Sequence, residues 1–170
     1  MGVMFHHFHD NKIKKTGQGS VTPKQFEKII KSLLLNFNVL NPKEWLEKIF
    51  LNSLENNDVC ITFDDSLYCQ YKIGLKVLKK YKLKAFWFIY SSVFNGELNS
   101  FEIYRKFRVC YYKNFDEFFY QFIDLCKEFK YKKFEKKYFE KEIKIFKSLF
   151  PFYSNNDIIF RIIRNNVLNK

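Results

Sequence analysis

The segment Val59-Cys60-Ile61-Thr62-Phe63-Asp64-Asp65-Ser66 decides the fold class of this chain. Its first five residues are apolar or β-branched, which is typical of a strand buried inside a sheet, and the run stops at two adjacent aspartates. Further strands are expected at Ala85–Tyr90, which is uniformly apolar and aromatic, and at Val3–Phe8. Helical periodicity between these runs predicts parallel strands joined by helical crossovers, and hence an α/β fold.

Helix starts between the expected strands are marked by two capping sequences, Thr22-Pro23-Lys24-Gln25 and Asn41-Pro42-Lys43-Glu44. The second is followed by Trp45, Ile49 and Phe50, which are expected to form a buried stripe. Helical spacing returns over Tyr71–Tyr81.

After Ser92 the pattern changes, because no further strand is expected and the remaining periodic segments are all helical. They are Phe101–Tyr112, Phe115–Phe129, Lys132–Phe150 and Asp157–Leu168. The aromatic residues of Phe115–Phe129 are interpreted as core packing. We therefore predict an α/β region over residues 1–92 and a helical part over residues 93–170.

Composition limits the classes of function. The net charge of +12 comes from 26 Lys and only 4 Arg, which favours a solvated lysine surface over a selected phosphate-binding groove, so no nucleic-acid partner is expected. Charged or amide residues interrupt every apolar run before it reaches a membrane span, and the first residues do not resemble a secretory signal. A cytoplasmic location is therefore expected. The four cysteines form no C-x-x-C pair, which favours reduced thiols in the core.

Asp64 and Asp65 are the first candidates for chemistry. Adjacent carboxylates at the end of a buried strand are costly to place unless a cation compensates them, and ligands bind at this edge of parallel α/β sheets. One aspartate can ligate a metal while the other takes a proton from water. The alternative is a pair of solvated turn residues that cap the next helix.

All three histidines, His6, His7 and His9, lie at the end of the first expected strand, next to Asp10. Alternation along a strand predicts His7 and His9 on one face and His6 on the other. Their clustering suggests a place at or beside a metal or substrate site. Packed or surface histidines are the alternative.

Thr62-Phe63-Asp64-Asp65, a helix ending at Val77–Tyr81 and the strand Lys84–Ile89 together resemble the first motif of polysaccharide deacetylases with a NodB-type domain. Met4-Phe5-His6 is similar to the Tyr-His that opens many members. The resemblance covers about residues 3–92, a little over half of the chain. It implies a partial (β/α) barrel of NodB type that removes acetyl groups from an N-acetylated carbohydrate.

Under this resemblance Asp64 is the general base and Asp65 is a ligand of a divalent metal, most simply zinc. We expect His7 and His9 as further metal ligands and His6 as a substrate contact. The chain departs from the family at Ser66, where glycine is usual, and it has no histidine after His9 to supply the family's His-(Ser/Thr)-x-x-His motif.

The missing motif predicts that the chain resembles the front half of such an enzyme. Zinc binding and activity of the chain alone are then expected to be weak or absent, and a partner chain would supply the missing half. Two alternatives remain open. The first is a non-catalytic member of the lineage that binds a glycan or a protein, and the second is an unrelated basic RNA-binding protein that uses Lys and aromatic side chains.

Overall fold

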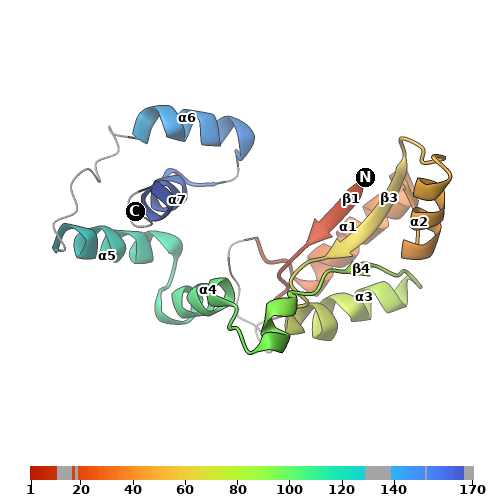
Figure 1. The fold of residues 1–170 in the computed structure, drawn as a ribbon, viewed down its shortest axis with the longest axis horizontal. Coiled ribbons are helices and arrows are strands. Elements are labelled where there is room, and N and C mark those ends of the chain that lie inside the picture. Colours follow the sequence, from red (N-terminus) through yellow and green to blue (C-terminus); the bar gives the residue numbers. More distant parts are fainter. Residues whose placement is uncertain (11–16, 18, 129–138, 152, 167–170) are drawn as a thin grey trace. The chain divides into compact units, whose positions relative to one another are not determined.

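The computed structural model describes residues 1–10, 17, 19–128, 139–151 and 153–166 (Figure 1). They belong to two compact units, Met1–Ile103 and Tyr104–Lys170. The expected division between residues 92 and 93 lies before this boundary, because a short 3₁₀ helix, η2 (Ser91–Asn95), and the start of α4 (Ser100–Tyr111) group with the first unit.

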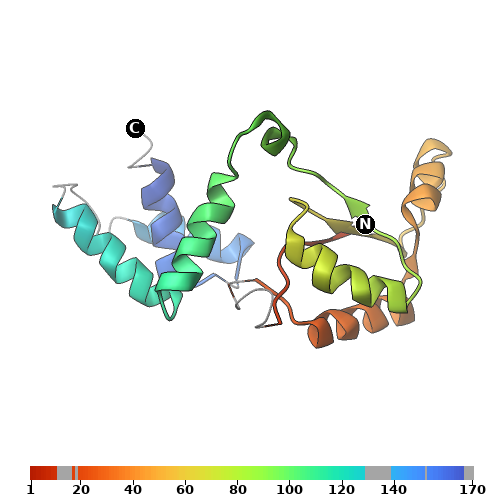
Figure 2. The ribbon, with the colours of Figure 1, turned by 90° about the horizontal axis from the view of Figure 1, so that it is seen from below.

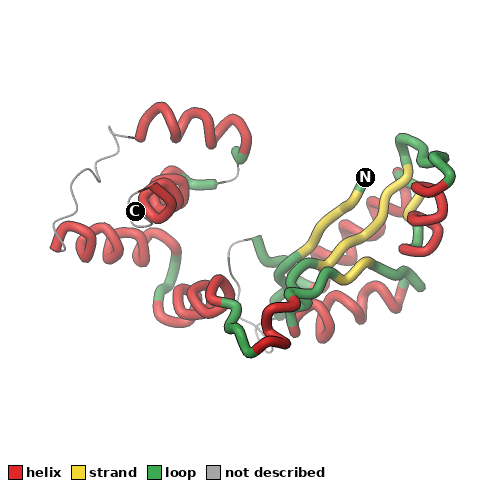
Figure 3. Tube along the Cα trace, in the orientation of Figure 1, coloured by secondary structure: helices red, strands yellow, loops and turns green. Residues whose placement is uncertain are grey.

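The first unit is built on a parallel sheet whose central strand is β3 (Asp58–Phe63), as the apolar run at this position predicts. The other three strands all pair with it: β1 (Gly2–Phe5), β2 (Asn38–Val39) and β4 (Phe86–Trp87). Since β1 occupies one edge of β3, the short strands β2 and β4 share the other edge. Figure 3 shows β1, β3 and β4 side by side. The sheet is open, and closure into a barrel is not shown within the described residues.

Helices alternate with these strands. They are α1 (Pro23–Asn36), α2 (Pro42–Phe50), the π-helical turn η1 (Gln70–Gly74) and α3 (Leu75–Lys80), which continues directly from η1. The capping sequences act as expected at both helix starts. Gln25 accepts from the Thr22 backbone N–H at 2.8 Å, and Glu44 accepts from the Asn41 backbone N–H at 2.8 Å.

The main core lies between one face of the sheet and two helical segments, α1 and η1–α3, which run side by side (Figure 2). Its centre is aromatic: Phe26 meets Phe8 edge-on at a centroid distance of 4.9 Å, and Phe8 meets Phe63 at 5.5 Å. All three rings are fully buried. The Phe63 ring also meets the Trp87 ring edge-on, at a centroid distance of 4.7 Å.

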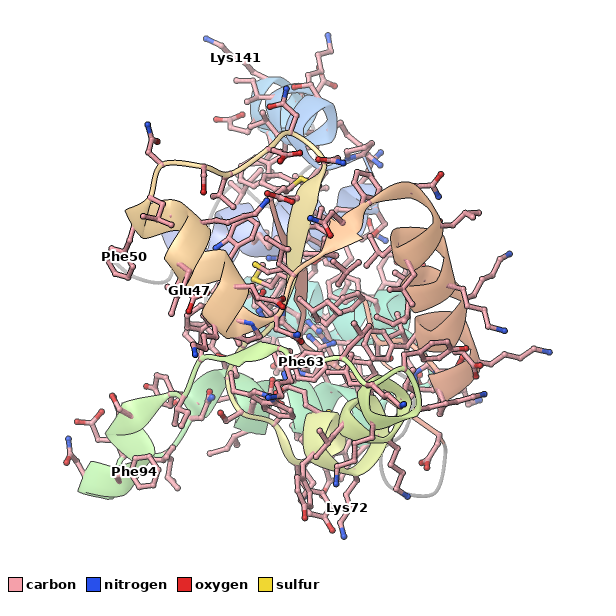
Figure 4. All side chains as sticks on the ribbon, turned by 90° about the vertical axis from the view of Figure 1, so that its right-hand side faces the viewer. Glu47, Phe50, Phe63, Lys72, Phe94 and Lys141 are labelled. Atoms are coloured by element: carbon pink, nitrogen blue, oxygen red, sulfur yellow. The ribbon has the colours of Figure 1, made fainter. Side chains whose placement is uncertain are left out.

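The opposite face of the sheet is much more exposed. Met4 of β1 and Phe88, which follows β4, are 57% and 55% exposed. The buried stripe expected on α2 is not found, because the helix has no buried residue and Phe50 at its end is 83% exposed (Figure 4). The apolar spacing of α2 is real, but no described element packs over it closely enough to bury it.

Two expected strands are shorter than the sequence predicts. The run Val3–Phe8 pairs with β3 only as far as Phe5, and from His6 the chain leaves the ladder so that Phe8 bridges to Val21. Ala85–Tyr90 contributes only Phe86–Trp87 as a strand, although the Phe88 N–H still donates to the Phe63 carbonyl at 2.8 Å. The strand β2 is only two residues long, and it pairs Asn38 with Asp58 and Val39 with Val59.

The second unit is helical, as predicted, and within its described residues it contains no strand. Its helices after α4 are α5 (Phe115–Glu128), α6 (Glu140–Leu149) and α7 (Asn155–Asn166). Ile158 and Ile163 of α7 are fully buried, and Phe160 meets several α5 rings edge-on, so the aromatic residues of α5 serve largely as core. The parts of the expected helices at 132–138 and 167–168 lie outside the described residues. No described helix is both long and apolar enough to cross a bilayer.

Candidate functional site

The candidate site forms where β1, β3 and β4 end together. The register pairs Met4 with Thr62 and Thr62 with Phe86. His6, Asp64 and Phe88 come two residues after Met4, Thr62 and Phe86. Backbone hydrogen bonds continue beyond the strands at this end, since the Asp64 N–H donates to the Phe5 carbonyl at 3.2 Å. Alternation along β3 places Asp64, like Thr62, on the face opposite the main core. Phe88 stacks on Phe86, which pairs with Thr62, and His6 Nε2 lies within 3.5 Å of Asp64 Oδ2, so the three residues form a row.

Both aspartates lie at the carboxyl end of the central strand, as the sequence predicts, and they lie beside His6. His6 Nε2 is 3.5 Å from Asp64 Oδ2 and 4.0 Å from Asp65 Oδ2. The side chains of His6, Asp64 and Asp65 are 39%, 28% and 36% exposed, so the carboxylates remain open to a ligand from solvent. Among the described side chains, the His6 imidazole is the only group that pairs with the two carboxylates.

The turn after Asp64 is left-handed. Asp65 has φ 69° and Ser66 has φ 47°, a region that side chains other than glycine adopt at a cost. The family that the sequence resembles usually has glycine at the position of Ser66. The turn is therefore of the kind that glycine favours, and here the chain adopts it with serine, whose hydroxyl donates weakly to the Phe88 carbonyl at 3.4 Å.

Replacing Ser66 by glycine is expected to stabilise the first unit by about 1 kcal/mol, because glycine removes the steric cost of the left-handed conformation. Thermal unfolding followed by tryptophan fluorescence measures this, since Trp45 and Trp87 both lie in the first unit. Ser53→Gly is the matched control. Ser53 is also exposed and donates to a carbonyl at 3.4 Å, but it is not among the described residues with positive φ. Equal effects of both substitutions would contradict the assignment of strain to Ser66.

His7 and His9 do not join this row. His7 is buried, and its Nε2 lies 2.7 Å from Glu102 Oε1 of α4. His9 Nδ1 lies 2.9 Å from the hydroxyl of Ser20. Neither lies in a strand, so the alternation that grouped them has no structural basis. Glu102 could not be anticipated from the sequence, because nothing local links it to a histidine 95 positions away.

A further residue of the site, not expected from the sequence, is Gln70, a buried polar residue bonded to the backbone of Asp64. Its side chain contacts the backbone of both His6 and Asp64. A signal was present: Gln70 occupies the same helical stripe as Ile73, Gly74, Val77 and Leu78, all of which are buried. A lone amide on an otherwise apolar stripe indicates a specific hydrogen-bonding task.

The residues present do not make a complete zinc site. Zinc sites in proteins generally use three or four protein ligands. Asp65 and His6 provide neighbouring donors, but no three His, Cys, Asp or Glu side chains are grouped to hold a metal ion in the part of the chain that the structure describes. The set of Asp65, His7 and His9 expected from the sequence is not brought together.

We expect zinc to bind to the isolated chain with an affinity no tighter than micromolar, because at least one ligand is lacking. Calorimetry with Zn²⁺ on the unmodified chain and on Asp65→Asn measures this, with Asp124→Asn as a control for an exposed aspartate remote in sequence. Sub-micromolar binding that disappears only in Asp65→Asn would contradict the expectation.

Among known proteins, the chain shows similarity to solved structures but not to protein families or curated sequences. No protein-family model matches the chain, and no curated protein matches it significantly. The similar structures include the Streptococcus pyogenes deacetylase PplD in complex with acetate, with 23% identity and a TM-score of 0.46 over 64% of this chain and 51% of that one. A polysaccharide deacetylase from Bacillus cereus has 27% identity and a TM-score of 0.37 over 50% and 26% of the two chains.

A third similar structure is a de-N-acetylase from Aggregatibacter actinomycetemcomitans, with 18% identity and a TM-score of 0.44 over 58% of this chain and 40% of that one. The chain thus spans about half or less of the length of these structures. All are deacetylases by description, and the Thr62–Asp65 motif resembles polysaccharide deacetylases.

Proposed function

We propose that this chain is a portion of a hydrolase that removes acetyl groups from N-acetylated sugars, with Asp64 as its general base. The observation that carries the proposal is the row of His6, Asp64 and Phe88 at the carboxyl ends of three neighbouring parallel strands. A carboxylate there, partly exposed and next to an imidazole at 3.5 Å, can accept a proton from a water molecule.

The reaction needs one proton to move twice. As the water oxygen attacks the acetamide carbonyl carbon, its proton passes to the Asp64 carboxylate. When the carbon–nitrogen bond breaks, the same proton passes from Asp64 to the leaving sugar nitrogen, so that a free amine and acetic acid are released, and the acid then loses its proton to water to give acetate. His6, whose Nε2 is 3.5 Å from Asp64 Oδ2, would contact the substrate beside Asp64.

Phe88 offers a surface for the sugar. Its ring is 55% exposed and stacks with Phe86 at a centroid distance of 6.1 Å and an interplanar angle of 7°. Phe88 therefore adds an exposed apolar surface one residue after Trp87, just as Asp64 comes one residue after Phe63, the partner of Trp87. The C–H face of a pyranose ring can pack on such a surface, while its acetamide group reaches the carboxylate.

A divalent metal ion is also part of the proposed site. Asp65 would be one ligand of a divalent cation, and the further ligands would come from outside the described residues, in a partner chain or segment that completes the site. Because the residues present do not complete the metal site, the described part of the chain is proposed to bind the sugar but to hydrolyse it slowly or not at all. A cytoplasmic location remains part of this proposal.

Binding without turnover is therefore the expected result. A tetramer of N-acetylglucosamine should perturb the NMR signals of His6 and Phe88, while acetate release stays close to background with added Zn²⁺ or Co²⁺. The loss of one oxyanion donor alone typically lowers the rate by about 10²–10³, and an incomplete metal site removes at least that much. A cello-oligosaccharide of the same length, which lacks acetamide groups, is the control ligand.

Two results would contradict the proposal in different ways. Equal perturbation by both oligosaccharides, or none by either, would argue against N-acetylated sugars as the substrate class. Rapid acetate release that is abolished in Asp64→Asn would support the role of Asp64 but would show that the site is complete without a partner.

A further inference from the structure

Gln70 is the only glutamine or asparagine with no exposed surface among the described residues. It begins the π-helical turn η1, directly beneath the ends of β1 and β3. A buried amide is costly unless its donors and acceptor are satisfied, so the partners of Gln70 indicate what it does.

Those partners are three backbone groups from three separate segments. Gln70 Nε2 donates to the His6 carbonyl at 2.8 Å and also to the Asp64 carbonyl. Gln70 Oε1 accepts from the Leu67 N–H at 3.0 Å. One side chain thus joins the residue after β1, the residue after β3 and the loop that follows the aspartates.

The orientation of the amide is fixed by these partners. Two carbonyl oxygens can only accept, so they need the NH₂ group, whereas the Leu67 N–H can only donate and needs the oxygen. The opposite orientation would lose all three hydrogen bonds. No other uncharged side chain of similar length offers two donors and one acceptor in this geometry.

The Gln70 side chain can reach these backbone groups because η1 lies close to the strands. Gly74, one turn after Gln70, lies against the Phe63 and Phe8 rings, and a Cβ atom there would be 3.0 Å from Phe63 and 3.1 Å from Phe8. Glycine therefore lets η1 approach the sheet. A π-helical turn, a feature often found at functional sites, sets Gln70 at the strand ends.

We propose that Gln70 is a positioning residue that fixes the spacing between His6 and Asp64 and closes the left-handed turn at Asp65 and Ser66. The inference rests on the proposed function for the chemistry of Asp64. It goes beyond that function by assigning the site's geometry to a residue that does not touch the substrate.

The spacing matters because the two side chains stand on different segments. Their 3.5 Å separation depends on the relative placement of two backbone carbonyls that are 58 positions apart in the chain, and Gln70 holds both. At the same time, the Leu67 bond secures the loop that carries Asp65. Losing the amide frees each of these segments to move independently.

The clamp can be tested first in the unmodified protein. NMR scalar couplings across hydrogen bonds should connect Gln70 Nε2 to the carbonyl carbons of His6 and Asp64. Their absence would overturn the proposal, and this measurement does not depend on any variant folding.

Gln70→Met then removes the amide at nearly constant volume. Hydrogen exchange at the Leu67 amide should accelerate about tenfold or more, and the His6 and Asp64 amide signals should broaden or shift. The Leu40 amide, bonded to the Val59 carbonyl at the other end of the sheet, is the internal reference. Ile73→Val, a core change in the same helical turn, is the matched control.

A merely structural role predicts a different pattern, in which Leu40 and Leu67 lose protection alike in both variants. That pattern would overturn the proposal. The outcome is also independent of the sugar-binding test, because the clamp can be present in a chain that binds no N-acetylated sugar. Conversely, sugar binding with unchanged exchange at Leu67 in Gln70→Met would leave the proposed function intact and remove the positioning role.

Discussion

Replacing Asp58 by alanine is expected to lower the thermal midpoint of the first unit by about 10 °C or more. Asp58 opens the central strand and is completely buried. Its carboxylate accepts hydrogen bonds from Lys48 Nζ at 2.9 Å, Asn38 Nδ2 at 2.6 Å and the Glu55 N–H at 2.9 Å. Alanine would leave three donors, one of them charged, without their acceptor.

Tryptophan fluorescence measures the midpoint, because Trp45 and Trp87 report on this unit. Glu47→Ala is the control: Glu47, labelled in Figure 4, also pairs with a lysine of α2, at 3.8 Å, but both side chains are exposed. Exposed pairs of this kind contribute little to stability. If both variants unfolded at the same temperature, the buried network would not be the source of the stability.

The same network gives a dependence on pH. Hydrogen bonds from the Glu55 N–H and then Lys48 hold the pKa of Asp58 at about 2, below its ordinary value of 3.8. A pKa lowered by folding contributes stability above about pH 4, and that stability is lost as the pH falls toward 2. The difference in midpoint between the unmodified protein and Asp58→Asn should therefore shrink from pH 6 to pH 2. Taking the difference removes the contribution of Glu27, whose pKa of about 2 lies in the same range.

Replacing Gly74 by alanine is expected to destabilise the first unit by about 1–2 kcal/mol. Alanine is favoured over glycine in a helix by about 1 kcal/mol, but overpacking a tight core costs about 1–3 kcal/mol. The second effect is expected to prevail because the new Cβ would be 3.0 Å from the Phe63 ring and 3.1 Å from the Phe8 ring, both fully buried. Chemical unfolding monitored by fluorescence gives the difference.

Gly2→Ala is the matched control for this substitution, because its Cβ would meet Thr62 and Cys60 only at ordinary distances of 3.7 and 4.0 Å. A second test uses Phe8→Leu, which makes room next to Gly74. The cost of Gly74→Ala should fall in that background, since neighbouring residues are coupled. A stabilised Gly74→Ala variant would show that the rings yield and that helix propensity dominates.

The sequence predicts most of the fold where the signal is local. The run Val59–Phe63 forms the central strand, and its stop at Asp64 and Asp65 places both carboxylates at the edge where parallel α/β sheets generally bind ligands. The placement of His6 beside them follows from parallel pairing. These features depend on short-range patterns and on the general rule that parallel strands end together.

The remaining features depend on tertiary contacts that no local pattern encodes. His7 and His9 were grouped by strand alternation, which fails because the chain leaves the ladder at His6. The apolar stripe of α2 was expected to be buried, but burial depends on what packs over it. Gln70 was missed because helical periodicity marks where a side chain faces and does not reveal which backbone groups it meets.

The central strand carries carboxylates at both ends, and their surroundings differ. At the amino end, Asp58 is surrounded by donors and fully enclosed, whereas Asp64 at the carboxyl end is 28% exposed and lies beside one imidazole. In a living cell, selection should therefore act on Asp58 through the stability of the protein and on Asp64 through the chemistry of the site. Changes at Asp58 would raise the unfolded fraction and reduce the amount of protein that escapes proteolysis, whereas changes at Asp64 would leave its abundance nearly constant.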